Sequence, residues 1–133
     1  MIPDFDEHGY LPIGVHPATL AEIEERFGRE SELRRIQFES IQWMVELAVK
    51  AGVVRIVING SYVTDVYEPN DVDCVLLIGD SYPADGRASD ELEDGLPFVS
   101  FELAFADVFD GIVDKIFATD RKLISKEMVE VIL

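Results

Sequence analysis

The chain has 133 residues with 27 acidic and 11 basic side chains, for a formal net charge of −16, and 48% of its residues are hydrophobic. This apolar content is enough for one compact core and too high for a disordered acidic tail. The negative charge repels phosphate backbones and anionic lipid surfaces, which argues against polynucleotide or membrane binding through a basic face. We therefore predict a single domain over residues 1–133.

The first 51 residues predict an arm followed by two helices. Residues 1–18 contain three prolines and two glycines among aromatic side chains, which is typical of an extended, irregular arm rather than a helix or a strand. Thr19 and Glu22 form a capping box that predicts a helix over about 20–27. A longer helix is predicted from about 31 to 51, with an apolar face made of Leu33, Ile36, Ile41, Trp43, Met44, Leu47 and Ala48.

The remaining residues alternate strand patterns with turn signals. Apolar, β-branched runs and helical spacing predict strands over 53–58, 71–78, 98–105 and 128–133, and a helix over 107–118 that Asp107 could cap. Residues 79–97 are rich in Gly, Pro, Ser and Asp and predict a long loop. This order predicts an α+β fold, an α/β sandwich in which one mixed sheet of about four to five strands packs with helices.

Cysteine usage and the N-terminal sequence bear on the compartment. Cys74 is the only cysteine, so no intramolecular disulfide can form and a buried thiol is expected. No segment resembles a secretory signal, and no apolar run approaches the length of a membrane span. We therefore expect a cytoplasmic protein that does not associate with membranes.

The stretch from Ile58 to Val75 has the strongest chemical signal. A Gly60-Ser61 turn ends one strand, nine residues follow, and Asp71 and Asp73 begin the next strand. Side chains alternate across a strand, so the two carboxylates share a face with Cα atoms about 6 to 7 Å apart and could bridge divalent cations. A glycine at the turn allows close approach to a phosphate, and the serine hydroxyl and nearby amides supply donors.

These residues resemble the signature of the nucleotidyltransferase superfamily typified by DNA polymerase β. Ile58-Asn59-Gly60-Ser61 and Asp71-Val72-Asp73-Cys74 match its two halves, although the residue before the glycine is usually apolar and here it is Asn59. The resemblance implies that Gly60 and Ser61 hold a nucleoside triphosphate and that Asp71 and Asp73 bind two Mg²⁺ ions. It also implies a third carboxylate on a later strand, for which Glu102 is the match by position.

The whole chain is also similar to a family of small bacterial nucleotidyltransferase-like proteins. The similarity lies in residues 2–12 and 16–19, Gly60 to Thr64, Pro69 to Asp73 and Phe117 to Arg121. Lys126-Glu127 departs from the usual Lys-Gly of that family. The resemblance implies magnesium-dependent transfer of a nucleoside monophosphate to a protein or small-molecule hydroxyl, in an antitoxin or defence component with a protein partner.

Simpler interpretations of the same residues stay open. Asp71 and Asp73 could be solvent-facing acids at the start of a strand, and Glu102 an exposed strand residue. Asp107 is the rival third carboxylate, which a role as helix cap also explains. The alternative function is a catalytically inactive domain that senses nucleotides or binds proteins, because 133 residues leave no room for the additional helical domain of most active relatives.

Overall fold

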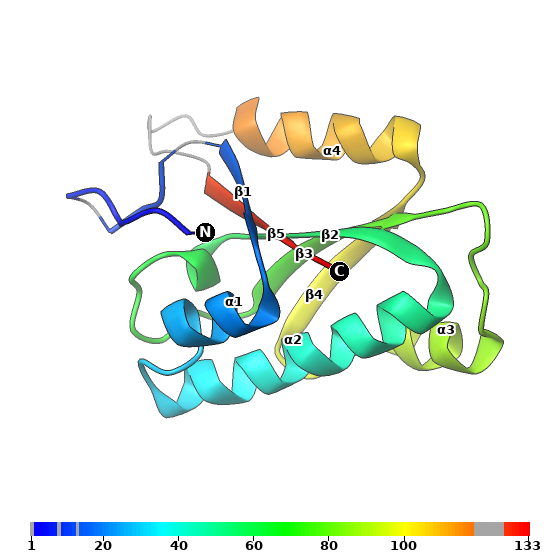
Figure 1. The fold of residues 1–133 in the computed structure, drawn as a ribbon, viewed down its shortest axis with the longest axis horizontal. Helices are drawn as coiled ribbons and strands as arrows, with labels where there is room; N and C mark the ends of the chain where they lie inside the picture. The colour runs from blue at the N-terminus through cyan, green and yellow to red at the C-terminus, as the bar shows by residue number, and fades with distance from the viewer. Residues whose placement is uncertain (1, 8, 13, 119–126) are drawn as a thin grey trace.

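The structure, a computed structural model, describes residues 2–7, 9–12, 14–118 and 127–133, without the side chains of 113–118 and 127. In these residues five strands form one mixed sheet with four α-helices packed on it, which confirms the predicted α+β class (Figure 1). The strands are β1 Gly14–Ala18, β2 Val53–Asn59, β3 Val72–Ile78, β4 Val99–Ala104 and β5 Glu127–Val131. The helices are α1 Leu20–Phe27, α2 Glu32–Ala51, α3 Gly86–Glu93 and α4 Ala106–Ala118, with a 3₁₀ turn η1 at Ser61–Val63.

The strand order in the sheet is β1-β5-β2-β3-β4. Strand β2 is antiparallel to both β3 and β5, whereas β1 runs parallel to β5 and β4 runs parallel to β3. Helices α1, α2 and α3 lie on one face of the sheet and α4 lies on the other (Figure 1). The sheet is therefore the middle layer of three. No helix in the described part of the chain is long and apolar enough to cross a membrane.

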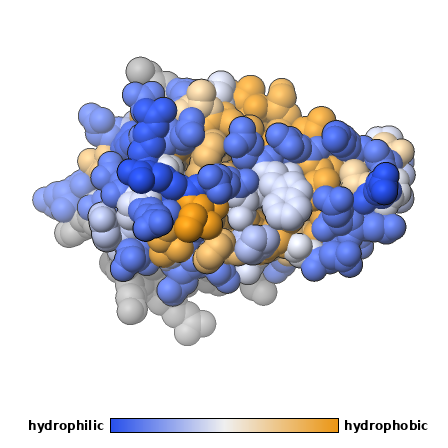
Figure 2. Space-filling view, turned by 90° about the horizontal axis from the view of Figure 1, so that it is seen from below, coloured by the Kyte–Doolittle hydropathy of each residue, from blue (hydrophilic) through white to orange (hydrophobic). Residues whose placement is uncertain are grey.

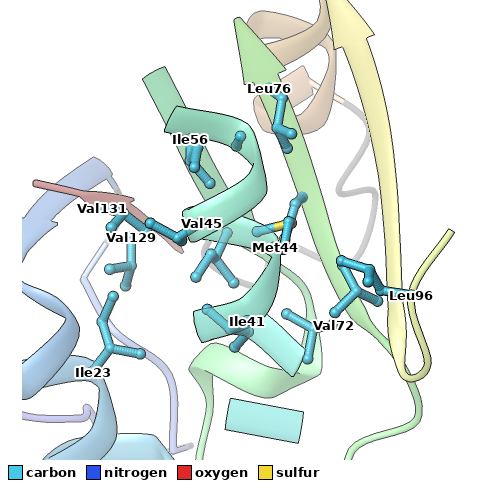
Figure 3. Close-up of a cluster of buried hydrophobic side chains, with 14 of the residues drawn as sticks. Ile23, Ile41, Met44, Val45, Ile56, Val72, Leu76, Leu96, Val129 and Val131 are labelled. Atoms are coloured by element: carbon cyan, nitrogen blue, oxygen red, sulfur yellow. The ribbon is translucent and has the colours of Figure 1, made fainter. Parts of the chain in front are cut away.

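The larger of two apolar clusters fills the space between α2 and the sheet. Figure 3 shows side chains of α2 directed toward side chains of β2, β3 and β5. The residues labelled there are Ile23, Ile41, Met44, Val45, Ile56, Val72, Leu76, Leu96, Val129 and Val131. Cys74 belongs to this cluster, and its burial raises the pKa of the thiol, as a buried cysteine requires.

Local sequence signals define the first two helices. Thr19 accepts a hydrogen bond from the Glu22 amide at 3.2 Å and its own amide donates to Glu22 Oε1 at 3.0 Å, so the predicted capping box is present. Ser31 caps α2 by accepting from the Arg34 amide at 3.1 Å. Helix α2 ends at Ala51 before Gly52, as the sequence predicts.

Two elements correct the sequence prediction. Residues 14–18 of the predicted irregular arm form β1, because they pair in register with the last strand, from Gly14 opposite Glu127 to Ala18 opposite Val131. The predicted loop 79–97 contains α3, which Asp85 caps by accepting from the amides of residues 87 and 88. The sequence of β1 contains a proline and that of α3 is polar, so neither has a clear local signal. Pairing with β5 forms the strand, and the Asp85 cap starts the helix.

The predicted apolar face of α2 was wrong at two positions. Trp43 is 45% exposed and Ile36 is 39% exposed, whereas Arg34 and Gln37 are buried. The buried face repeats at three- and four-residue spacing through Arg34, Gln37, Phe38, Ile41, Met44, Val45 and Ala48. Arg34 and Gln37 take inward positions because backbone carbonyls accept hydrogen bonds from their side chains there.

The predicted cap of α4 was also displaced. The helix begins at Ala106, so Asp107 lies in its first turn and accepts from the amide of Val108 at 3.0 Å. The carbonyl of Phe105 accepts from the amides of Val108 and Phe109, which puts Phe105 at the cap position. In the first turns of this helix Val108 is exposed and Phe109 is buried.

The Arg34 guanidinium is buried against the segment between η1 and β3. It donates to the carbonyl oxygens of Tyr62 at 2.8 Å, Thr64 at 2.8 Å and Val66 at 3.0 Å, and to that of Phe27 at 3.1 Å. No carboxylate in the described part of the chain forms an ion pair with it. Burial lowers the pKa of Arg34, and nearby negative charges partly offset that effect. One side chain thus fixes the path of several residues of backbone.

The N-cap residue Ser31 and Gln37 of α2 continue this contact toward β3. Ser31 Oγ donates to the carbonyl of Tyr67 at 3.1 Å. Gln37 Nε2 donates to the carbonyls of Pro69 at 2.9 Å and Asn70 at 2.6 Å. Residues 62–70, which link the Gly60 turn to Asp71, are therefore attached to α2 along most of their length.

We predict that Arg34→Met lowers the free energy of unfolding by about 3 kcal/mol or more, because several buried carbonyls lose a charged donor. The measurement is urea denaturation followed by circular dichroism. The control is Arg35→Met, which removes the same charge one position along the helix at an exposed site. Equal losses in the two variants would contradict the role given to Arg34.

Candidate functional site

The turn after β2 brings backbone against a carboxylate. Gly60 has φ 81° and ψ −163°, a conformation that side chains other than hydrogen rarely allow. A Cβ atom at this position would lie 2.6 Å from Oδ2 of Asp73. The structure thus places Gly60 and Asp73, which are distant in sequence, in direct contact.

Strand register puts the predicted acids on one face of the sheet. Asp73 lies opposite Asn59 on β2 and Ser100 on β4. Glu102 lies one step along that same face of β4, opposite Val75. Asp71 precedes β3 and accepts a hydrogen bond from Ser100 Oγ at 3.5 Å. The three acids therefore share the face that α4 covers further along.

The acid-bearing end of that face is open to solvent. Under α4 the face is apolar and buried, with a second cluster made of Val57, Val75, Ala104, Phe109 and Met128. Beyond the cluster, Asp71, Asp73, Ser100 and Glu102 are all exposed. A ligand could reach these four side chains without displacing any helix in the described part of the chain.

The electrostatics of the site favour a cation. Desolvation raises the pKa of Asp73, and the neighbouring charge of Asp71 raises it further. Neither carboxylate forms an ion pair with a basic side chain within the described ranges. Carboxylate, hydroxyl and amide oxygens are the donors that Mg²⁺ and Ca²⁺ prefer. The donor set therefore fits a hard divalent cation at Asp71 and Asp73.

Glu102 shares a face with the two aspartates but forms no three-residue metal group with them in the described residues. No group of three or more His, Cys, Asp or Glu side chains is arranged to hold a metal ion, as far as residues 2–7, 9–12, 14–118 and 127–133 are concerned. The rival third acid, Asp107, lies on α4 rather than on this end of the sheet.

Ser100 and Phe98 were not singled out from the sequence, and Asn59 was noted only as a departure from the motif. Asn59 and Ser100 flank Asp73 on the two neighbouring strands. Phe98 has a φ of 65°, rare for an aromatic residue, and its carbonyl accepts from the amide of Val72 at 2.8 Å. Alternation along β4 could have found Ser100, which lies two residues before Glu102. Nothing in the sequence signals the backbone at Phe98.

A cavity of about 200 Å³ lies beside residues 62–70. It is lined by Phe5, Arg26, Glu30, Arg34, Thr64, Asp65 and Tyr67. All five guanidinium N–H groups of Arg34 are directed to carbonyl oxygens. Arg26 donates to the carbonyls of Ile2 and Pro3 and lies over the Phe5 ring. Both cations have structural partners, so the cavity does not resemble a phosphate site.

We predict that Gly60→Ala lowers the free energy of unfolding by roughly 1–3 kcal/mol, since the new Cβ requires a strained φ and meets the Asp73 carboxylate. The control is Gly86→Ala at the start of α3, where no atom lies within 4 Å of the added Cβ. Thermal unfolding of both variants measures the difference. A Gly60→Ala protein as stable as Gly86→Ala would show that the turn does not have this contact.

We predict that Asp73→Asn stabilises the protein at neutral pH. Folding raises the pKa of Asp73, so its ionised form costs stability once the pH exceeds the folded pKa. Below the ordinary aspartate pKa the carboxyl is protonated in both states, and the gain should vanish there. Urea denaturation across this pH range measures the effect, with the exposed Asp80→Asn as control. A gain that is independent of pH would contradict this assignment.

Comparison with known proteins gives a family without an assigned activity. Residues 3–130 match DUF6932, which is described as a family of unknown function. No curated protein and no solved structure matches the chain. Because the match covers nearly all of the sequence, including the Gly60 turn and all three candidate acids, the chain belongs to the DUF6932 family.

Proposed function

We propose that this protein is a divalent-cation-dependent nucleotidyltransferase, which transfers a nucleoside monophosphate from a nucleoside triphosphate to a hydroxyl group. The proposal depends above all on the contact between Gly60 and the Asp73 carboxylate. That contact joins a turn able to approach a phosphate to an acid able to hold a cation. The sequence resemblance to the nucleotidyltransferase superfamily supports the same interpretation.

Each residue has a distinct proposed role. Asp71 and Asp73 hold Mg²⁺, and Glu102, on the same face, is the proposed third ligand. Gly60 admits the triphosphate close to the backbone, and Ser61 offers its hydroxyl. In the reaction, the acceptor oxygen bonds to the α-phosphorus, its proton passes to solvent, and the bond to the departing pyrophosphate breaks. When bound, a pair of Mg²⁺ ions stabilises negative charge on the attacking and leaving oxygens.

Charge narrows the proposed substrates. The chain has a net charge of −16, and Asp71, Asp73 and Glu102 lie together at the open end of the face that α4 covers. A triphosphate entering this region needs cations to reduce the repulsion. A long polynucleotide has many more phosphates to screen and is the poorer acceptor. We therefore propose a protein or small-molecule acceptor, and a cytoplasmic location.

The test of binding is thermal unfolding with each nucleoside triphosphate, with and without Mg²⁺. We expect at least one triphosphate to raise the melting temperature only when Mg²⁺ is present. The double variant Asp71→Asn, Asp73→Asn should lose the shift while staying folded. The control Asp90→Asn, Asp94→Asn, which removes two exposed acids from the α3 region, should keep it. Lack of a shift with every triphosphate in the unaltered protein would refute the proposal.

A second candidate is a domain that binds a nucleotide without turning it over. It is favoured by the arrangement of Asp71, Asp73 and Glu102, which in the described part of the chain do not form a complete three-acid metal group. Incubation with α-labelled triphosphate and Mg²⁺ distinguishes the two. Release of pyrophosphate together with labelled acceptor supports transfer, and saturable binding without either product supports the sensing role.

A further inference from the structure

The outward side of α2 has an unusual pattern of apolar and acidic residues. Glu32, Ile36, Glu39, Trp43 and Glu46 follow one another at spacings of four and three, so they form a single ridge along the helix, here called the α2 ridge. All five are exposed, with Trp43 at 45% and Ile36 at 39%. The two apolar side chains therefore alternate with three carboxylates.

The side chains of the α2 ridge belong to neither apolar cluster of the described residues. The opposite side of α2 meets the core and the segment 62–70 through Arg34, Gln37, Ile41 and Met44. Within the described ranges, Glu32, Glu39 and Glu46 form no ion pair, and Trp43 has no ring contact or cation contact. Figure 2 views the molecule from the α1, α2 and α3 side and shows apolar side chains exposed among hydrophilic ones.

A hollow lies beside the ridge. It has a volume of about 450 Å³ and is lined by Glu24, Gly28, Arg29, Arg35, Phe38, Glu39 and Gln42. Glu39 belongs to both the hollow and the α2 ridge, so the two are adjacent. The surface thus has two apolar side chains between carboxylates, next to a depression that two glutamates and two arginines line.

The negative charge of the α2 ridge favours some binding partners and disfavours others. A second copy of the chain would place the same three glutamates against each other, and each copy has a net charge of −16. Anionic lipid and nucleic acid are repelled for the same reason. An exposed tryptophan between unpaired carboxylates matches a partner that presents apolar side chains bordered by Lys or Arg.

We propose that the α2 ridge binds a partner protein through a basic amphipathic helix. The spacing of four and three along the ridge is the spacing at which one helix packs against another. In this complex Trp43 and Ile36 contact the apolar side of the partner helix, and Glu32, Glu39 and Glu46 pair with its basic side chains. The α2 ridge lies on the face of the sheet opposite Asp73, so this binding does not depend on the proposed reaction.

The probe is a synthetic helical peptide with leucines along one side and lysines on both borders, titrated at physiological salt. Trp43 is the only tryptophan, so its emission reports directly on the α2 ridge. We expect saturable binding, a shift of the emission to shorter wavelength and reduced quenching by acrylamide. Trp43→Ala, followed by calorimetry, should weaken binding at least tenfold.

The charge requirement is tested with two matched triple variants. Glu32→Gln, Glu39→Gln, Glu46→Gln should weaken peptide binding at least tenfold, whereas Asp90→Asn, Glu91→Gln, Asp94→Asn around α3 should change it less than threefold. Melting curves confirm that all variants fold. Equal weakening by both triples, or unchanged quenching of Trp43, overturns the proposal in favour of unspecific attraction. A dimer without peptide that Trp43→Ala abolishes, seen by light scattering, overturns it in favour of self-association.

Discussion

The buried guanidinium of Arg34 is the constraint on which the candidate site depends. A charge removed from water needs a complete set of partners, and Arg34 finds them in backbone carbonyls rather than in a carboxylate. Those carbonyls lie in the segment that joins Gly60 to Asp71, so the charge requires the segment to follow one path. Helix α2, on the opposite face of the sheet, thereby positions the segment that leads to the open, acidic end.

Sequence patterns were sufficient where a local interaction decides the structure. The capping box of Thr19 and Glu22 and the β-branched run after Gly52 predicted α1 and β2 closely. Sequence patterns were insufficient where an interaction between distant residues decides the local structure. The strand β1 exists because β5 pairs with it, although its own sequence contains Gly14 and Pro17. Arg34 points inward because the carbonyls of residues 62–66 accept its hydrogen bonds. The periodicity of α2 contains no information about those carbonyls.

The site shows the same division. Alternation along the strands predicted that Asp71 and Asp73 share a face, and the register adds Glu102 to that face. The contact of Gly60 with Asp73, and the position of Asn59 opposite the same acid, come from pairing between strands. Asn59, which departs from the usual apolar residue of the motif, adds an amide next to the carboxylate. The ionised carboxylate of Asp73 lowers the stability of the fold because it is partly desolvated, and the same charge attracts a cation.

The position of β5 in the sheet has a consequence for how the chain folds. This strand follows every other described element in sequence, yet it lies between β1 and β2. Until residues 127–131 are synthesised, β1 has no neighbour and the edge of β2 stays unpaired. The chain must then close loops of more than a hundred residues to join β1 to β5, which costs entropy and slows folding. Assembly of the sheet is therefore a late event, during which unpaired strand edges are open to aggregation and to chaperones.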